Sequence, residues 1–129
     1  MGYKESELTG DIINAFYQVY NQLGHGFLEK VYENALVHEL RKRKHEVVQQ
    51  APIKVRYDGA IVGEYFADLL VNGAVILELK AAVAIAPEHE AQLLNYLKAT
   101  DIDVGLVLNF GPEPQIKRKI FETARKIER

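Results

Sequence analysis

The sequence between residues 64 and 80 constrains the fold more than any other stretch of the chain. It contains two hydrophobic segments joined at Asn72-Gly73, a dipeptide that is typical of a tight β-hairpin turn. Three charged residues interrupt the apolar character of these segments, namely Asp68, Glu78 and Lys80. Because a buried charge is costly unless it is paired or bound to a metal ion, charges in such strands need a chemical reason.

The spacing of these three residues suits a divalent metal ion. Glu78 and Lys80 are two residues apart, so their side chains leave the same face of a strand, and Asp68 lies on the partner strand. Magnesium in proteins takes one or two carboxylates together with water and phosphate oxygens. Such a metal would acidify a water molecule, and a nearby lysine can hold that water or stabilise negative charge that develops on a phosphodiester.

A second interpretation of the same residues needs no metal. Glu78 and Lys80 can form a solvated salt bridge at a sheet edge while Asp68 caps a turn, because the Glu-x-Lys pattern is common and weakly specific. The residues around Glu78 are apolar on both faces of the expected strand, however, and this favours a buried site.

The register of the hairpin decides whether one metal can contact both carboxylates. A two-residue turn would pair Val71 with Ala74, and it would place Asp68 and Glu78 on opposite faces of the sheet. A shared site therefore requires one extra residue of offset, from a three-residue loop with Gly73 in the left-handed conformation or from a β-bulge in either strand. We expect that irregular register, with both carboxylates and Lys80 on one face, towards Gln92.

Length and composition bound the remaining possibilities. A chain of 129 residues is expected to form a single domain over residues 1–129, with a core of its own. The chain has no cysteine, which fits a reducing cytoplasm, and no apolar run approaches the roughly 20 residues of a membrane span. A net charge of −2 argues against coating nucleic acid by bulk electrostatics.

Hydrophobic periodicity and turn signals predict an α/β fold, a mixed β-sheet flanked by α-helices. One helix should begin at Ser6 or Thr9 and end before Gly24, and a second should bury Phe27, Val31, Ala35, Leu36 and Leu40. Strands are expected over residues 46–50, 53–57, 60–71 with a bend at Gly63, 75–80, 104–109 and 115–121, with a helix over residues 87–100 and a helical tail. The helix between strands 75–80 and 104–109 indicates a βαβ crossover.

Two polar pairs on the expected helices are further candidates. Gln92 and Tyr96 are four residues apart and share a helix face, as do Glu29 and Tyr32, which are three apart. By spacing alone, a half-buried polar pair on an amphipathic helix is the better-supported interpretation of Gln92 and Tyr96, and Glu29 is typical of an ordinary first-turn acid. The histidines show no metal-ligand spacing, and only His89, one turn before Gln92, is considered a candidate.

Several of these residues together resemble a known family. The string Gly26-Phe-Leu-Glu29-Lys-Val-Tyr32 is similar to the motif of the small bacterial GxxExxY proteins. It is followed in the order of the PD-(D/E)XK nuclease superfamily by Asp68, Glu78-Leu79-Lys80 and Gln92-x-x-x-Tyr96. The resemblance covers the chain from about Leu8 to Phe121, and it departs from the pattern in having Ala67 where a proline would precede the aspartate.

The resemblance implies a restriction-endonuclease-like core and a role for each matched residue. Asp68 and Glu78 would be metal ligands, with help from Glu29 and the main-chain carbonyl of Leu79, and Lys80 would be the catalytic lysine. Gln92 and Tyr96 resemble the extra motif of the RecB-like and Cas4-like branch, where such residues line the active site.

The expected function is hydrolysis of phosphodiester bonds in DNA with Mg²⁺ or Mn²⁺. Two alternatives stay open: a non-catalytic module that binds nucleic acid or protein, and a nuclease subunit that needs a partner. A binding module has no need to hold like-charged carboxylates together, which favours the enzyme. Because a domain this small has little room for both a catalytic cleft and a duplex-binding surface, we also expect a homodimer.

Overall fold

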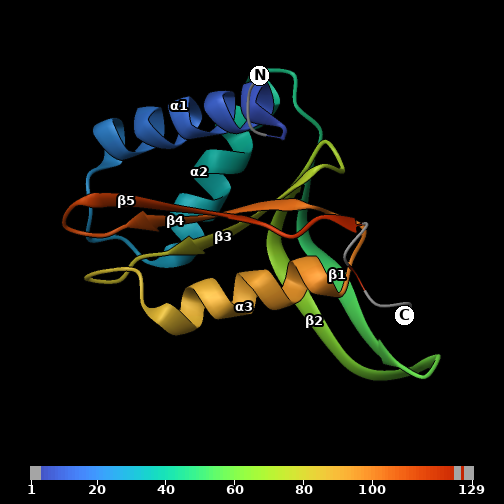
Figure 1. Ribbon diagram of the computed structural model, residues 1–129. Coiled ribbons are helices and arrows are strands. Elements are labelled where there is room, and N and C mark those ends of the chain that lie inside the picture. The colour runs from blue at the N-terminus through green and yellow to red at the C-terminus, as the bar shows by residue number, and fades with distance from the viewer. Residues whose placement is uncertain (1–3, 124–125, 127–129) are drawn as a thin grey trace.

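The computed structural model describes residues 4–123 and Lys126, and it consists of a five-stranded sheet between two layers of helices (Figure 1). In chain order the elements are α1 (Ser6–Leu23), α2 (Glu29–Lys42), β1 (Val47–Tyr57), β2 (Ala60–Val71), β3 (Val75–Lys80), α3 (Pro87–Lys98), β4 (Val104–Phe110) and β5 (Pro114–Ile120). The strands lie side by side in the order of their numbers. Among the described strands only β3 and β4 are parallel, and α3 connects them, so the predicted mixed sheet and crossover are confirmed.

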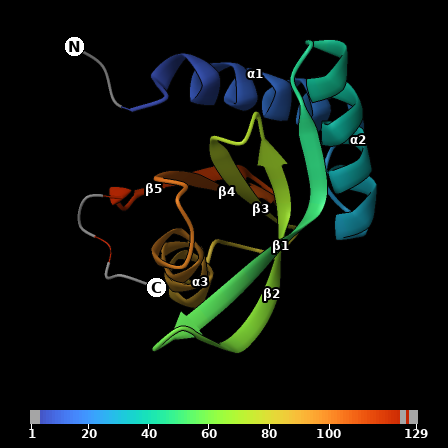
Figure 2. The same cartoon turned by 90° about the vertical axis from the view of Figure 1, so that its right-hand side faces the viewer.

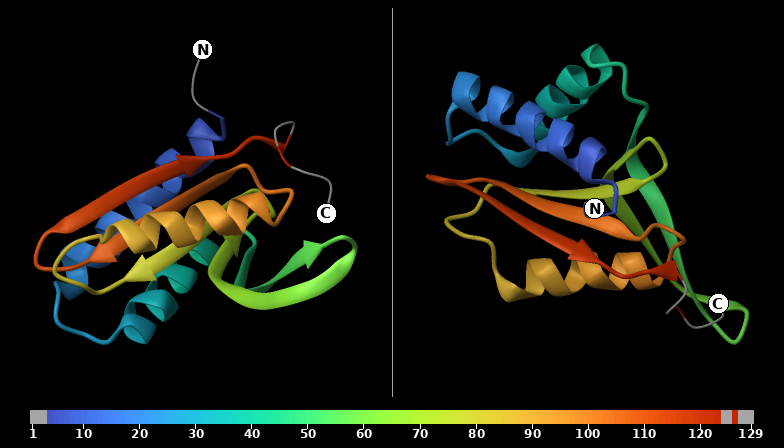
Figure 3. Two further views of the ribbon diagram at one scale, coloured as in Figure 1. Left: turned by 60° about the horizontal axis from the view of Figure 1, so that its bottom comes forward. Right: turned by 45° about the horizontal axis from the view of Figure 1, so that its top comes forward.

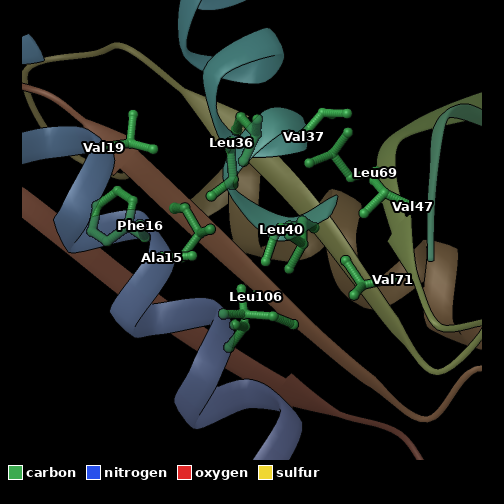
Figure 4. Close-up of a cluster of buried hydrophobic side chains, with 14 of the residues drawn as sticks. Ala15, Phe16, Val19, Leu36, Val37, Leu40, Val47, Leu69, Val71 and Leu106 are labelled. Atoms are coloured by element: carbon green, nitrogen blue, oxygen red, sulfur yellow. The ribbon is translucent and has the colours of Figure 1, made fainter. Parts of the chain in front are cut away.

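The alternation of side chains along the central strands produces two cores. On one face, Phe16 of α1 and Leu36 of α2 pack with Leu77 and Leu106 of the sheet, as the close-up in Figure 4 shows for part of this cluster. On the other face, α3 packs on a smaller apolar cluster. Glycine at position 105 permits this contact, because a Cβ there would lie 2.6 Å from a methyl carbon of Leu93. The candidate residues on α3 are thereby fixed against β3.

The buried face of α2 differs from the predicted one. Phe27 and Val31 are exposed, at 49% and 40%, whereas Tyr32 is fully buried. The reason is that Leu28 takes an extended conformation and α2 begins only at Glu29. Phe27 therefore lies in the connecting loop, and the first inward-facing residue of α2 is Tyr32, one residue after the expected Val31.

The two short strands expected over residues 46–50 and 53–57 form one continuous strand, β1, at the edge of the sheet. Pro52 is tolerated there because an edge strand leaves one side of its backbone without ladder hydrogen bonds. The expected bend at Gly63 is present as a register shift between Val55 and Arg56, opposite that glycine. Together β1 and β2 form a long arm that curves past α3 (Figure 2).

The remaining boundaries lie close to the predictions. α3 ends at Lys98, two residues before the expected end, and β5 begins at Pro114. The predicted helical tail falls largely outside the described residues. Within the part of the chain that the structure describes, no helix is both long enough and apolar enough to cross a membrane.

Candidate active site

The β2–β3 connection has the extra residue that a shared site requires. Val71 pairs with Val75, so Asn72, Gly73 and Ala74 form a three-residue connection. Both Asn72 and Gly73 have positive φ angles, 53° and 63°, and the Ala74 N–H donates to the carbonyl of Val71 at 2.9 Å. The left-handed Gly73 and the offset by one residue confirm the register prediction.

The regular pairing of β2 with β3 ends at Leu69 and Leu77, and two carboxylates occupy the next position. The Asp68 N–H donates to Oε2 of Glu78 at 2.9 Å, and the Leu79 N–H donates to Oδ2 of Asp68 at 2.8 Å. Each carboxylate thus accepts a backbone hydrogen bond from the opposite strand, in place of a strand carbonyl. The two acidic groups are brought together in the gap where the strands diverge.

The carboxylate pair has too little positive charge nearby to offset the effect of burial. Glu78 is only 4% exposed, and its burial, together with the neighbouring charge of Asp68, raises its pKa to about 8. Burial also raises the pKa of Asp68, and the charges of Glu33 and Glu29 add to that effect. The charge of Lys80 lowers the pKa of both carboxyl groups, but it does not offset the burial.

The donor set fits a hard divalent cation. Two carboxylates and the carbonyl of Leu79 are oxygen ligands of the kind that magnesium takes, and magnesium typically keeps several waters besides. Among the residues that the structure describes, no group of three or more His, Cys, Asp or Glu side chains is close enough to hold a metal ion. Glu29 lies at the exposed first turn of α2, near enough for its charge to act on Asp68 and Glu78, and its role as a ligand stays a prediction.

The third helix places Tyr96 near the carboxylates, with Gln92 hydrogen-bonded to it. The Gln92 amide donates to the Tyr96 hydroxyl at 2.9 Å, and the tyrosine is 5% exposed. Burial raises the pKa of Tyr96, and the charges of Glu78 and Asp68 raise it further, which places the phenol near the acidic pair. His89 instead supports the start of α3, because its Nδ1 accepts the N–H of Ala86 at 3.0 Å.

The tyrosine of the Gly26–Tyr32 string holds the loop before Glu29. The Tyr32 hydroxyl donates to the carbonyl of Gly24 at 2.6 Å and accepts the N–H of Phe27 at 3.2 Å. Its ring stacks on Phe110 of β4 with the centroids 4.4 Å apart. The motif therefore fixes where α2 begins, and with it the position of Glu29.

One acidic residue near the site was missed by the sequence reasoning. Glu33 is 6% exposed, accepts hydrogen bonds from Gln49 and Gln50 of β1, and pairs with Lys30 at 3.1 Å. The charge of Glu33 raises the pKa of Asp68 more than the charge of Glu29 does. The available signal was the spacing, since Glu29 and Glu33 are four residues apart on one helix face.

The fold and the site together define a class of protein. A mixed sheet between helices, with an acidic pair and a lysine where two of its strands diverge, is a restriction-endonuclease-like α/β domain. A family model described as the PD-(D/E)XK nuclease superfamily matches residues 6–120, and the chain belongs to this superfamily. Its membership of the GxxExxY family and of the RecB-like and Cas4-like branch stays a prediction.

Comparisons with individual proteins add the fold but no activity. No curated protein matches the chain significantly. A solved structure titled "Crystal structure of SSO0001" superimposes with a TM-score of 0.55 at 17% sequence identity. The superposition covers 92% of this chain and 59% of that one, so the chain spans less than two thirds of the solved structure.

Proposed function

We propose that the protein is a nuclease that hydrolyses phosphodiester bonds in DNA with Mg²⁺ or Mn²⁺. The observation that carries the proposal is the reciprocal carboxylate pair. Buried Glu78 and half-buried Asp68 lie side by side, with raised pKa values and with the charge of Lys80 acting on both. A fold without catalytic function gains no stability from such a pair, because like charges in a low-dielectric setting repel each other.

Each residue of the site has a chemical task in this proposal. Asp68, Glu78 and the carbonyl of Leu79 would hold the cation, with help from Glu29. When bound, the divalent ion supplies positive charge to the phosphate oxygens and lowers the pKa of water. Lys80 positions the attacking water and stabilises the negative charge that develops on the phosphate.

The residues on α3 orient the substrate. The hydrogen bond from Gln92 to Tyr96 uses one amide hydrogen, and the second amide hydrogen and the carbonyl oxygen of Gln92 are groups that can bind substrate. This role supports placing the chain in the RecB-like and Cas4-like branch, and the matched Gly26–Tyr32 string supports the GxxExxY family. We further propose a homodimer, which sedimentation at tens of micromolar would test.

A cleavage assay with labelled substrates tests the function. Single-stranded, double-stranded and branched DNA are incubated with the protein in Mg²⁺, Mn²⁺ or EDTA, and we expect cleavage with either metal but not in EDTA. Glu78→Gln and Lys80→Ala should abolish cleavage, whereas Lys117→Ala, which removes an exposed lysine of β5, should leave it unchanged. Far-UV circular dichroism shows that each variant is folded. A folded wild-type protein that cuts none of these substrates with either metal would refute the proposal.

A further inference from the structure

A large groove lies beside the candidate active site, between α3 and the arm formed by β1 and β2. We call it the arm groove; its walls come from residues 55–58 and Tyr65 of the arm, from α3 and Ala99 directly after it, and from Phe121 and Lys126, and its volume is about 1380 Å³. Figure 3 shows the arm curving past the C-terminal end of α3. Pockets for small ligands are about 300–1,000 Å³, so the groove is better suited to a chain-like ligand.

Two exposed aromatic side chains line the arm groove. Tyr57, next to the tip of the arm, is 75% exposed, and Tyr65 is 49% exposed. Exposed aromatic rings of this kind offer flat faces on which nucleic-acid bases stack, whatever the base. The neighbouring Phe66 is also exposed, at 57%, but it does not line the groove.

The arm groove adjoins the candidate active site at Tyr96. Tyr96 lines the groove together with its hydrogen-bond partner Gln92, and the charges of Asp68 and Glu78 act on the Tyr96 phenol. The rings of Tyr65 and Tyr96 lie 5.8 Å apart. A strand that stacks along the arm would therefore arrive at Asp68 and Glu78.

The charges in the groove walls argue for contact with bases more than with phosphates. Arg56 and Lys98 contribute positive charge, but Asp58 and Glu88 line the same walls. The ammonium of Lys126, which also lines the groove, is bound to the carbonyls of Thr100 and Ile102 and to Asp103. A net charge of −2 gives the chain as a whole no electrostatic attraction for the phosphates of a duplex. Bases are free to stack on protein rings only where they are unpaired.

We propose that the arm groove binds single-stranded nucleic acid, with bases stacked on Tyr57 and Tyr65, and that it leads the strand to the carboxylate pair. This inference rests on the proposed function and specifies its substrate class.

The test measures binding separately from cleavage. A fluorescein-labelled 20-nucleotide single strand and its duplex are titrated with the full chain in EDTA, and fluorescence anisotropy is recorded. We expect the single strand to bind at least tenfold more tightly than the duplex. Tyr57→Ala and Tyr65→Ala should each weaken its binding about tenfold, which corresponds to about 1.4 kcal/mol and lies within the range for loss of one stacked base.

Two matched variants control for damage to the fold. Tyr65→Phe keeps the ring and should bind within about twofold of wild type, and so should Phe66→Ala, which removes a comparably exposed ring of the same strand that does not line the groove. Equal binding of duplex and single strand would overturn the inference, as would a Phe66→Ala defect as large as that of Tyr65→Ala. So would a shift from dimer to monomer in the tyrosine variants with unchanged DNA binding, because the arm would then be a self-interface.

The two proposals fail in distinguishable ways. Tyrosine-dependent binding of single strands with no cleavage in Mg²⁺ or Mn²⁺ would refute the nuclease and support the groove. Metal-dependent cleavage of duplex that is unaffected by Tyr57→Ala and Tyr65→Ala would support the nuclease and refute the groove.

Discussion

Replacing Glu78 by glutamine should remove much of the pH dependence of stability in the metal-free protein. The pKa of Glu78 is about 8 in the folded protein against an ordinary value of 4.5, because the side chain is buried next to Asp68. The folded state therefore holds a proton that the unfolded chain has already released. The contribution of Glu78 to the stability of the wild type is therefore fully present below pH 4.5 and is lost progressively as the pH rises towards 8.

The size of the effect follows from these two values. Between pH 5 and pH 8 the folded and unfolded states differ by up to one proton, and each pH unit then changes the free energy of unfolding by about 1.4 kcal/mol. Three pH units give an upper bound of about 4 kcal/mol. Glutamine has no proton to lose, and its side-chain carbonyl can still accept the Asp68 N–H.

Urea unfolding in EDTA at pH 5, 6, 7 and 8 measures the effect. We expect the wild type to lose several kcal/mol over this range and Glu78→Gln to change much less, so that the variant is the more stable protein at pH 8. Glu90→Gln, in a surface ion pair with Lys119, should follow the wild-type profile, because its lowered pKa lies outside this range. Parallel profiles for wild type and Glu78→Gln would show that Glu78 is already ionised at pH 5 in the folded protein, and the burial argument would be refuted.

Further predictions concern the metal, the lysine, the register and the groove. Magnesium at ten times its dissociation constant should stabilise the wild type by about 1.4 kcal/mol, which raises its melting temperature by about 5 °C. Asp68→Asn should reduce that rise, and equal melting curves of the two proteins in magnesium would count against the site. Lys80→Ala should abolish cleavage yet keep the magnesium-induced rise, and loss of both would assign the lysine to folding. Deleting Ala74 should shift the register of β3 by one residue and so eliminate both metal binding and cleavage. The melting temperature in magnesium and the cleavage assay measure these two losses. The affinity for a single strand should fall as the salt concentration rises. Two phosphate contacts, from Arg56 and Lys98, give a slope of about −1.4 in log K against log salt concentration. A slope steeper than about −4 would contradict base stacking as the main source of affinity.

Local sequence chemistry predicted much of the fold and the core of the site. The Asn72-Gly73 turn, the amphipathic repeat of α1 and the apolar runs of β3 and β4 are determined by neighbouring residues, so their bounds could be predicted closely. Counting along a regular hairpin places Asp68 and Glu78 on opposite faces, and the hypothesis of a shared metal site predicted the extra residue that brings them to one face, because a shift of one residue changes the face of every side chain.

The features that were missed depend on contacts between distant segments. The inward face of α2 is determined by the loop that Tyr32 anchors to Gly24, and periodicity alone does not show where that loop ends. Glu33 is held by Gln49 and Gln50, which are 16 and 17 residues further along the chain. Continuity of β1 through Pro52 requires knowing that this strand is at the sheet edge.

The divergence of β2 from β3 connects the acidic site with the arm groove. Pairing of β2 with β3 extends only from Val71 to Leu69, whereas pairing of β2 with β1 continues to the tip of the arm at Ala60. Once β2 leaves β3, its backbone can no longer complete the ladder there, and the carboxylates of Asp68 and Glu78 accept the exposed N–H groups instead. The same divergence directs the arm past α3 and opens the groove. A strand bound along the arm would therefore reach the carboxylates at the point where the sheet divides, so the structural feature that buries the acidic pair also gives the substrate access to it.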